Sequence, residues 1–218
     1  FLSGLSTAIS FIARGISFKI IAAFLGTSGM VLIGQLRDFL KLGNVFSTFG
    51  IENGIVKYTS ENYKSEKEFV KIISTSFKIN LFSSLIICLI AIWQYDAILE
   101  NFFFGLNDTI NKSVFVLILL ISIFSFSIHT CFLAIINGLK KIKFWVAINI
   151  ISNFTAALLL VLLVFLFDNK INGALYAIII SQIVTLIINV TLIYFLKLFK
   201  ISQLFSSFSS DYFIKLSN

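Results

Sequence analysis

Three long runs of this sequence contain no acidic or basic residue apart from a single histidine, His129. They extend over 113–136, 144–167 and 173–196, and each is 24 residues long. A helix needs about 20 apolar residues to cross a bilayer core of ~30 Å, and soluble helices are rarely apolar on every face. The three runs therefore predict membrane-spanning helices.

Three further apolar segments precede these runs, at about 2–25, 30–56 and 72–93. Hydrophobic residues make up 58% of the chain and charged residues only 12%, a composition typical of membrane proteins. We therefore predict an all-α, polytopic membrane helix bundle with six transmembrane helices within residues 1–200. Residues 201–218 are predicted to form an amphipathic cytoplasmic segment that leads toward a further span.

Lysine residues divide unequally between the loops on the two sides of the predicted bundle. Lys112 and Lys170 lie on one side, whereas ten lie on the other: Lys57, Lys64, Lys67, Lys71, Lys140, Lys141, Lys143, Lys197, Lys200 and Lys215. Because Lys and Arg accumulate on the cytoplasmic face, both termini are predicted to be cytoplasmic. The same asymmetry accounts for most of the net charge of +7, so that charge indicates topology and no nucleic-acid partner is predicted.

Basic side chains inside the first two spans are the main candidates for function. A charge at mid-membrane costs about 2.5–3.5 kcal/mol on insertion scales, so such residues usually face a bundle interior or an aqueous cavity. At 1.5 Å per residue, Arg14 and Lys19 lie ~18 Å and ~10 Å from the outer end of the first span, and Arg37 and Lys41 lie roughly 10–16 Å into the second. We predict that these four cations line one cavity for an anion, most naturally phosphate or pyrophosphate.

Two acidic residues, Asp38 and Glu52, also fall within the predicted spans. Asp38 can pair with Lys41 at i+3, and both acids are candidate ion-coupling residues. Snorkelling, in which a long side chain bends to the interface, is the alternative interpretation. It fits Lys19, Lys78 and Glu52, because each lies within about two turns of a span end.

The later spans carry uncharged polar residues on two helix faces: Asn149, Ser152 and Asn153 on one, and Gln182, Thr185 and Asn189 on the other. Interhelical hydrogen bonds are the favoured interpretation, and the lining of a hydrated cavity is the alternative. His129 is interpreted as a packing residue. Because the sequence has no Walker-type loop, metal-spaced cluster or nucleophile motif, we predict no cofactor, metal site or catalytic residue.

Two segments resemble the opening of bacterial polysaccharide flippases: KIIAAFLGTSG at 19–29 and GQLRDFLKLGNVFSTFGIENGIVKYTSE at 34–61. The shared features are a basic residue in the first span, an LG-x-x-G turn, and a second span that closes in NG-x-x-KY. NGLKK at 137–141 and NGALYA at 172–177 extend the similarity over nearly the whole chain. The sequence is most similar to O-antigen and enterobacterial common antigen (lipid III) flippases of the multidrug/oligosaccharidyl-lipid/polysaccharide exporter superfamily.

This resemblance implies two six-helix lobes that face each other across a central cavity, of which this chain supplies the N-terminal one. It also implies transfer of polyprenyl-pyrophosphate-linked oligosaccharide from the cytoplasmic to the periplasmic leaflet of the bacterial inner membrane by alternating access, in O-antigen or lipopolysaccharide biosynthesis. Lys19, Arg37 and Lys57 match basic positions of the family. The expected partners are the lipid-linked oligosaccharide, membrane lipid, the missing C-terminal lobe and polysaccharide assembly proteins.

Three other functions stay open at this stage. A cation-coupled multidrug exporter of the same superfamily would favour acidic cavity residues, whereas these spans contain five bases and two acids. A membrane polysaccharide polymerase would be expected to carry a large periplasmic loop, and the longest outer loop here covers only about 94–112. A purely structural membrane subunit is the third alternative. We predict a transporter, not an enzyme.

Overall fold

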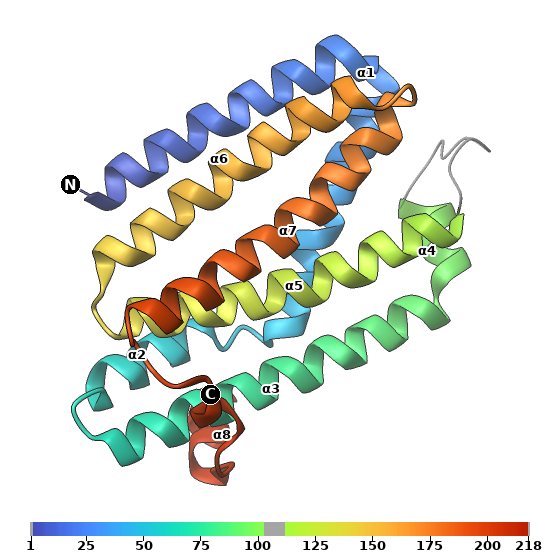
Figure 1. Ribbon diagram of the computed structural model, residues 1–218. Coiled ribbons are helices and arrows are strands. Elements are labelled where there is room, and N and C mark those ends of the chain that lie inside the picture. The colour runs from blue at the N-terminus through green and yellow to red at the C-terminus, as the bar shows by residue number, and fades with distance from the viewer. Residues whose placement is uncertain (1, 103–111, 218) are drawn as a thin grey trace.

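The computed structural model describes residues 2–102 and 112–217, and every regular element in those two ranges is a helix (Figure 1). In chain order these are α1 (Leu2–Thr48), α2 (Glu52–Asn62), α3 (Glu66–Trp93), α4 (Tyr95–Phe102), α5 (Lys112–Gly138), α6 (Ile142–Leu166), α7 (Lys170–Phe195), the 3-10 helix η1 (Ile201–Phe205) and α8 (Ser210–Ser217). In the described ranges, α1, α3, α5, α6 and α7 are long and apolar enough to cross a membrane. The prediction of an all-α membrane bundle is confirmed.

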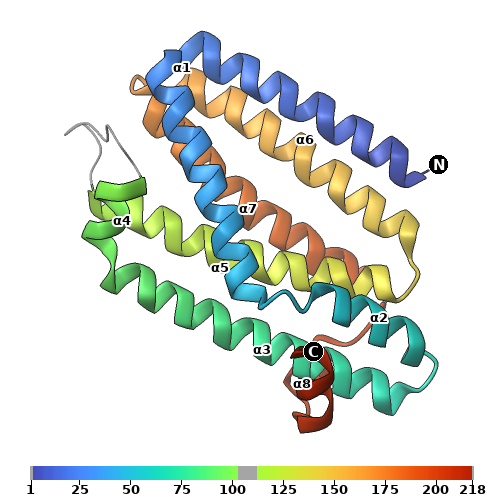
Figure 2. The ribbon, with the colours of Figure 1, turned by 180° about the vertical axis from the view of Figure 1, so that it is seen from behind.

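The first helix, α1, bends at Gly26, where φ is 68° and ψ is −167°. This backbone conformation costs glycine little, because glycine has no Cβ. Without the bend, 47 residues at 1.5 Å each would extend about 70 Å, more than twice the bilayer core. The bend divides α1 into arm 1 (residues 2–25) and arm 2 (residues 27–48), which diverge from Gly26 (Figure 2). The five long helices therefore give six spans when the two arms are counted separately.

Arm 2 ends at Thr48, whereas the predicted second span continues to Val56. The helix is interrupted because Phe49 and Gly50 both adopt positive φ values, 49° and 68°. The short helix α2 then begins at Glu52. The third span, in contrast, is longer than predicted, because α3 begins at Glu66 and not near residue 72. Its first turn carries acidic residues, which the helix dipole favours at that end.

The long helices pack in an order that differs from their order in the chain. α6 lies between arm 1 and α7, and α5 lies between α7 and α3 (Figure 1). Two glycines allow especially close helix contacts. A Cβ at Gly173 of α7 would lie 2.4 Å from the main-chain oxygen of Leu163 in α6, and one at Gly138 of α5 would lie 2.5 Å from Cβ of Thr59 in α2.

The interior has two apolar cores with a polar layer between them. The core nearer the Gly26 bend includes Phe115 and Ile123 of α5, and the core at the opposite end includes Phe132 and Ile136 of the same helix. The layer between them consists of buried polar side chains from four helices. They are Asn44 and Ser47 of arm 2, Asn80, Ser83 and Ser84 of α3, Ser122, Ser125, Ser127 and His129 of α5, and Ser181, Thr185 and Asn189 of α7. We call this layer the polar belt.

Hydrogen bonds in the polar belt connect helices that are distant in the chain. The Ser127 hydroxyl of α5 donates to Oδ1 of Asn80 in α3 at 2.7 Å. The Asn189 amide of α7 donates to Nδ1 of His129 in α5. Outside the belt, the Asn153 amide of α6 donates to Oγ of Ser10 in arm 1 at 3.0 Å. The interhelical interpretation of these polar residues is therefore confirmed for Asn153 and Asn189.

The two sets of lysines lie at opposite ends of the bundle. The larger set lies on α2, the start of α3, the α5–α6 connection and the segment after α7, which share one end (Figure 1). Lys112 and Lys170 begin α5 and α7 at the other end, near the Gly26 bend. We call the first of these the lysine-rich end. The positive-inside rule predicts that this end faces the cytoplasm.

This orientation can be tested by labelling single cysteines at Ser65 and Asn169, two exposed positions at opposite ends of the bundle, in a chain whose Cys88 and Cys131 are replaced by serine. An impermeant maleimide added to the periplasmic side should modify position 169 and leave position 65 unmodified until the membrane is permeabilised. Modification of position 65 alone would show that the bundle is inserted with the opposite orientation.

Candidate functional site

The candidate site lies between the two arms of α1, which carry all four predicted cavity cations. Arm 1 buries Ser17, Ile21 and Leu25, one residue per turn, against the rest of the bundle. Arm 2 buries Leu32, Leu36 and Leu40 in the same way. The functional side chains lie beside or opposite these packed stripes.

Arg37 of arm 2 reaches across to arm 1. Its guanidinium carbon lies 5.3 Å from the centre of the Phe18 ring, a cation–π contact that connects the two arms. Arg37 is half-buried, and Arg14 lies within electrostatic range of it. Phe18 follows Arg14 by one helical turn, so both side chains leave the same face of arm 1. The structure thus brings Arg14 within range of Arg37, whereas the depths counted from the predicted span ends place Arg37 level with Lys19.

No carboxylate neutralises this arginine pair within residues 2–102 and 112–217. The ion pairs there are Lys41–Asp38 and Lys71–Glu68, both at 2.9 Å. Two guanidinium groups that repel each other, without an acidic partner, form a site that an anion would stabilise.

Lys41 and Asp38 form the pair predicted from their i,i+3 spacing. Their side chains are 70% and 73% exposed, so the ion pair contributes little to stability and Lys41 can exchange partners readily. Lys19 lies apart from the arginines. It is exposed, whereas Ser17 and Ile21, two residues before and after it, are buried, which places Lys19 on the opposite side of arm 1.

Glu52 lies beyond the last residue of arm 2, at the first position of α2. Burial raises the pKa of its carboxyl group, and hydrogen bonds from Asn44 and Thr48 partly offset that rise. Asn44 in turn accepts a hydrogen bond of 3.2 Å from the Thr130 hydroxyl of α5. Glu52 is therefore connected to α1 and α5, whereas Asp38 is connected to Lys41.

The other two cations lie away from the arms. Lys57 is exposed on α2, with its ammonium 5.1 Å from the centre of the Tyr58 ring. Lys78 of α3 donates a hydrogen bond to the main-chain oxygen of Ser206, near the C-terminus. The sequence reasoning missed the roles of Phe18 and Ser206. The i+4 spacing of Phe18 from Arg14 could have indicated that both side chains share a helix face. Nothing in the sequence indicates the contact of Lys78 with Ser206.

The model of a family described as polysaccharide biosynthesis protein matches residues 1–217. The chain belongs to this family. The predicted resemblance is thereby confirmed at the level of the family. A search of curated proteins finds no match.

A solved structure of a multidrug resistance MATE family transporter of the MOP superfamily, in its outward-facing conformation, has the same fold as this polysaccharide biosynthesis family member. The TM-score is 0.66 and the sequence identity 13%, with 97% of this chain and 50% of that chain covered. This chain therefore spans half the length of that transporter. The family and the five apolar helices identify a multi-pass membrane protein.

Proposed function

We propose that the chain forms one lobe of a flippase that moves polyprenyl-pyrophosphate-linked oligosaccharide, such as an O-antigen repeat unit, from the cytoplasmic to the periplasmic leaflet by alternating access. Membership of the polysaccharide biosynthesis family supports the class of substrate. The observation that carries the proposal is the unneutralised pair Arg14 and Arg37 between the arms of α1.

A pyrophosphate is the part of this substrate that the arginine pair fits. Each guanidinium presents a planar fork of donors to phosphate oxygens, and such charge-assisted hydrogen bonds are stronger than neutral ones. The anion would also relieve the repulsion between Arg14 and Arg37. Lys41, once released from Asp38, would add a third positive charge. Lys19, on the other side of arm 1, would contact the substrate later in its passage.

A second lobe completes the proposed transporter. Alternating access requires two bundles that rock about a site at their interface. The arms of α1 expose large apolar side chains, including Phe11 at 78% and Phe46 at 61%, which a second lobe or lipid would cover. The half-length match to the MATE transporter supports a C-terminal lobe of the same kind as the partner.

For ion coupling, Glu52 is a better candidate than Asp38. Its carboxyl group is half-buried and joins Asn44 of arm 2 to the start of α2, so a change in its protonation would act on the helix break at Phe49 and Gly50. Asp38 is exposed and already paired with Lys41. We propose Glu52 as the coupling residue of the two.

Depletion of this protein in its host tests the proposed function. We expect lipid-linked oligosaccharide to accumulate while the surface polysaccharide disappears, and the accumulated lipid should be inaccessible to a periplasmic glycosidase. Normal surface polysaccharide, combined with increased sensitivity to cationic drugs, would contradict the proposal and favour the multidrug exporter.

A further inference from the structure

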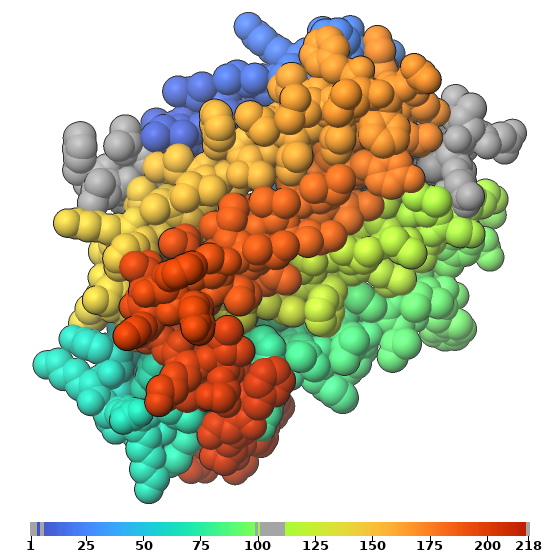
Figure 3. Space-filling view, viewed as in Figure 1, coloured from blue at the N-terminus to red at the C-terminus, as the bar shows by residue number. Residues whose placement is uncertain are grey.

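The chain folds back on itself after α7. Residues 197–217, which we call the C-terminal strap, comprise η1 and α8 and lie against the first half of α3 (Figure 1). Figure 3 shows the strap raised on the surface of the bundle at the lysine-rich end, beside α2 and α3. The segment predicted only as an amphipathic lead is therefore an ordered part of this lobe.

The inner side of the strap is polar where it contacts α3. The main-chain oxygen of Ser206 accepts a hydrogen bond of 2.9 Å from Oγ of Ser74 and another from the ammonium group of Lys78. The Ser209 main-chain N–H donates to Oγ1 of Thr75 at 3.1 Å. Polar side chains of α3 and main-chain groups of the strap thus satisfy one another's hydrogen-bonding capacity.

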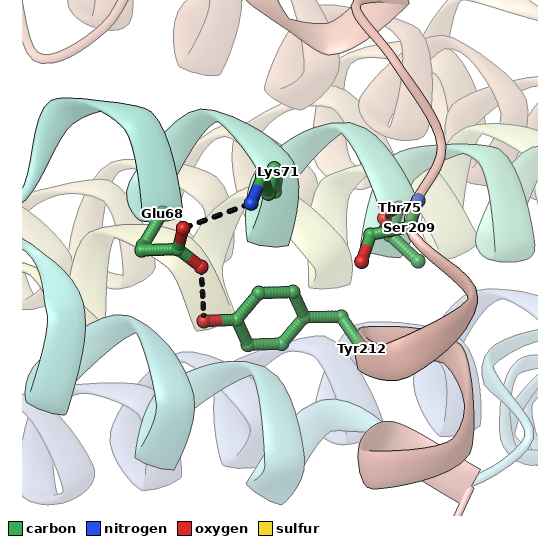
Figure 4. A network of polar contacts seen from close by, with 5 residues as sticks. All are labelled: Glu68, Lys71, Thr75, Ser209 and Tyr212. Carbon is green, nitrogen blue, oxygen red and sulfur yellow. Dashed lines mark hydrogen bonds and ion pairs between the residues drawn. The ribbon is translucent and has the colours of Figure 1, made fainter.

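Tyr212 makes a further polar contact with the start of α3. Its hydroxyl donates to Oε2 of Glu68 at 2.9 Å, and Lys71 pairs with the other carboxylate oxygen at 2.9 Å (Figure 4). Burial raises the pKa of Tyr212 to about 12, and its hydrogen bond to the charged Glu68 adds to the rise. The phenol therefore keeps the proton that it donates at neutral pH.

The outer side of the strap is aromatic. Phe205, Phe208 and Phe213 are 66%, 51% and 45% exposed, whereas Leu204 and Leu216 are buried in the core beneath them. Ser207, Ser210 and Asp211 are exposed beside these phenylalanines, so the outer surface of the strap combines apolar rings with polar groups. Such a surface is expected at a membrane interface, where apolar and polar surroundings meet.

The length of α3 locates the strap relative to the bilayer. Its 28 residues extend about 42 Å, longer than a hydrocarbon core of ~30 Å, so part of it lies outside that core, and its charged first turns are the part that water favours. These turns carry Glu66, Lys67, Glu68 and Lys71, and the strap crosses α3 from Glu68 to Lys78. The strap thus lies where the polar start of α3 meets its apolar remainder.

We propose that the C-terminal strap is a membrane-interface anchor, with Phe205, Phe208 and Phe213 inserted among the acyl chains of the leaflet at the lysine-rich end. The exposed residues Lys200 and Lys215 flank these phenylalanines and would contact anionic headgroups. In this position the strap covers the polar face of α3 that carries Ser74, Thr75 and Lys78. It presents its phenylalanines to the lipid instead. This inference does not depend on the transported substrate.

Tryptophan fluorescence tests the anchor directly. Trp93 and Trp145 are first replaced by phenylalanine, and single tryptophans are then introduced by Phe213→Trp or Phe208→Trp. The purified chain is reconstituted into vesicles of phosphatidylcholine and phosphatidylglycerol whose acyl chains are brominated near the headgroup. We expect blue-shifted emission and loss of most of the fluorescence in both variants, compared with unbrominated vesicles.

Tyr63→Trp in the same background is the matched control, because Tyr63 is an exposed aromatic residue at the same end, outside the strap. Its emission should stay red-shifted and largely unquenched by bromine. If positions 208 and 213 both behave like position 63, while gel filtration shows folded protein, the strap faces water and the proposal is wrong. Quenching by acrylamide in place of bromine would lead to the same conclusion.

Discussion

Replacement of Arg37 by alanine in the complete transporter should abolish surface polysaccharide while membrane insertion stays normal. Losing a bidentate guanidinium–phosphate contact costs about 3 kcal/mol, or roughly a 100-fold loss of affinity. The substitution also removes the cation–π contact with Phe18 that connects the arms. Arg37→Lys should restore only part of the function, since an ammonium keeps the charge but loses the planar fork.

Surface polysaccharide and the amount of inserted protein are measured together in cells that express matched levels of each variant. Lys64→Ala removes a positive charge from an exposed position away from the arms and should have no effect. Phe18→Tyr should keep function, whereas Phe18→Leu, which keeps the apolar volume but loses the ring, should reduce it. Normal polysaccharide in the Arg37→Ala cells would rule out an essential role for this arginine.

Gly173→Val should destabilise the whole lobe. A Cβ at this position would lie 2.4 Å from the Leu163 main-chain oxygen and 3.2 Å from Cβ of Phe167, so α6 and α7 would have to separate. Overpacking typically costs about 1–3 kcal/mol, and we expect the upper part of this range, because the nearest obstacle is main chain and cannot move as a side chain does.

The thermal midpoint of the purified chain in detergent measures this effect. Gly15→Ala is the matched control: no atom lies within 4 Å of a Cβ there, and alanine favours a helix over glycine by up to about 1 kcal/mol. The midpoint should fall clearly in the Gly173 variant and stay level or rise in the Gly15 variant. Equal midpoints would mean that α6 and α7 do not approach as closely as the structure has them.

The sequence predicted the later spans well because their boundaries coincide with changes in composition. α5, α6 and α7 each begin or end near a lysine or aspartate next to an uncharged run. The Gly26 bend was also predictable, since glycine punctuates the LG-x-x-G segment. The end of arm 2 was not, because the apolar pattern continues through Phe49 and Ile51, and the interruption lies in backbone torsions.

The candidate site was partly predictable for a similar reason. Counted from the bend at Gly26, Arg14 and Arg37 lie twelve and eleven residues away and are level, whereas counting from the predicted span ends had put Arg37 level with Lys19. The direction of a side chain around the helix needs the packed face, and the buried stripe of arm 1 places Lys19 on the other side. The strap was beyond sequence reasoning, because Tyr212 and Glu68 are 144 residues apart.

The polar belt has a mechanical consequence. Apolar contacts can re-form with other neighbours after a shift, whereas interhelical hydrogen bonds in a bilayer, worth on average about 0.6 kcal/mol each, have fixed partners. The bonds Ser127–Asn80 and Asn189–His129 therefore resist both translation and rotation of α5 against α3 and α7. We therefore expect bending to be concentrated at Gly26 and at Phe49–Gly50, where the helical backbone is interrupted. Both positions bound arm 2, so motion there would move Arg37 relative to Arg14.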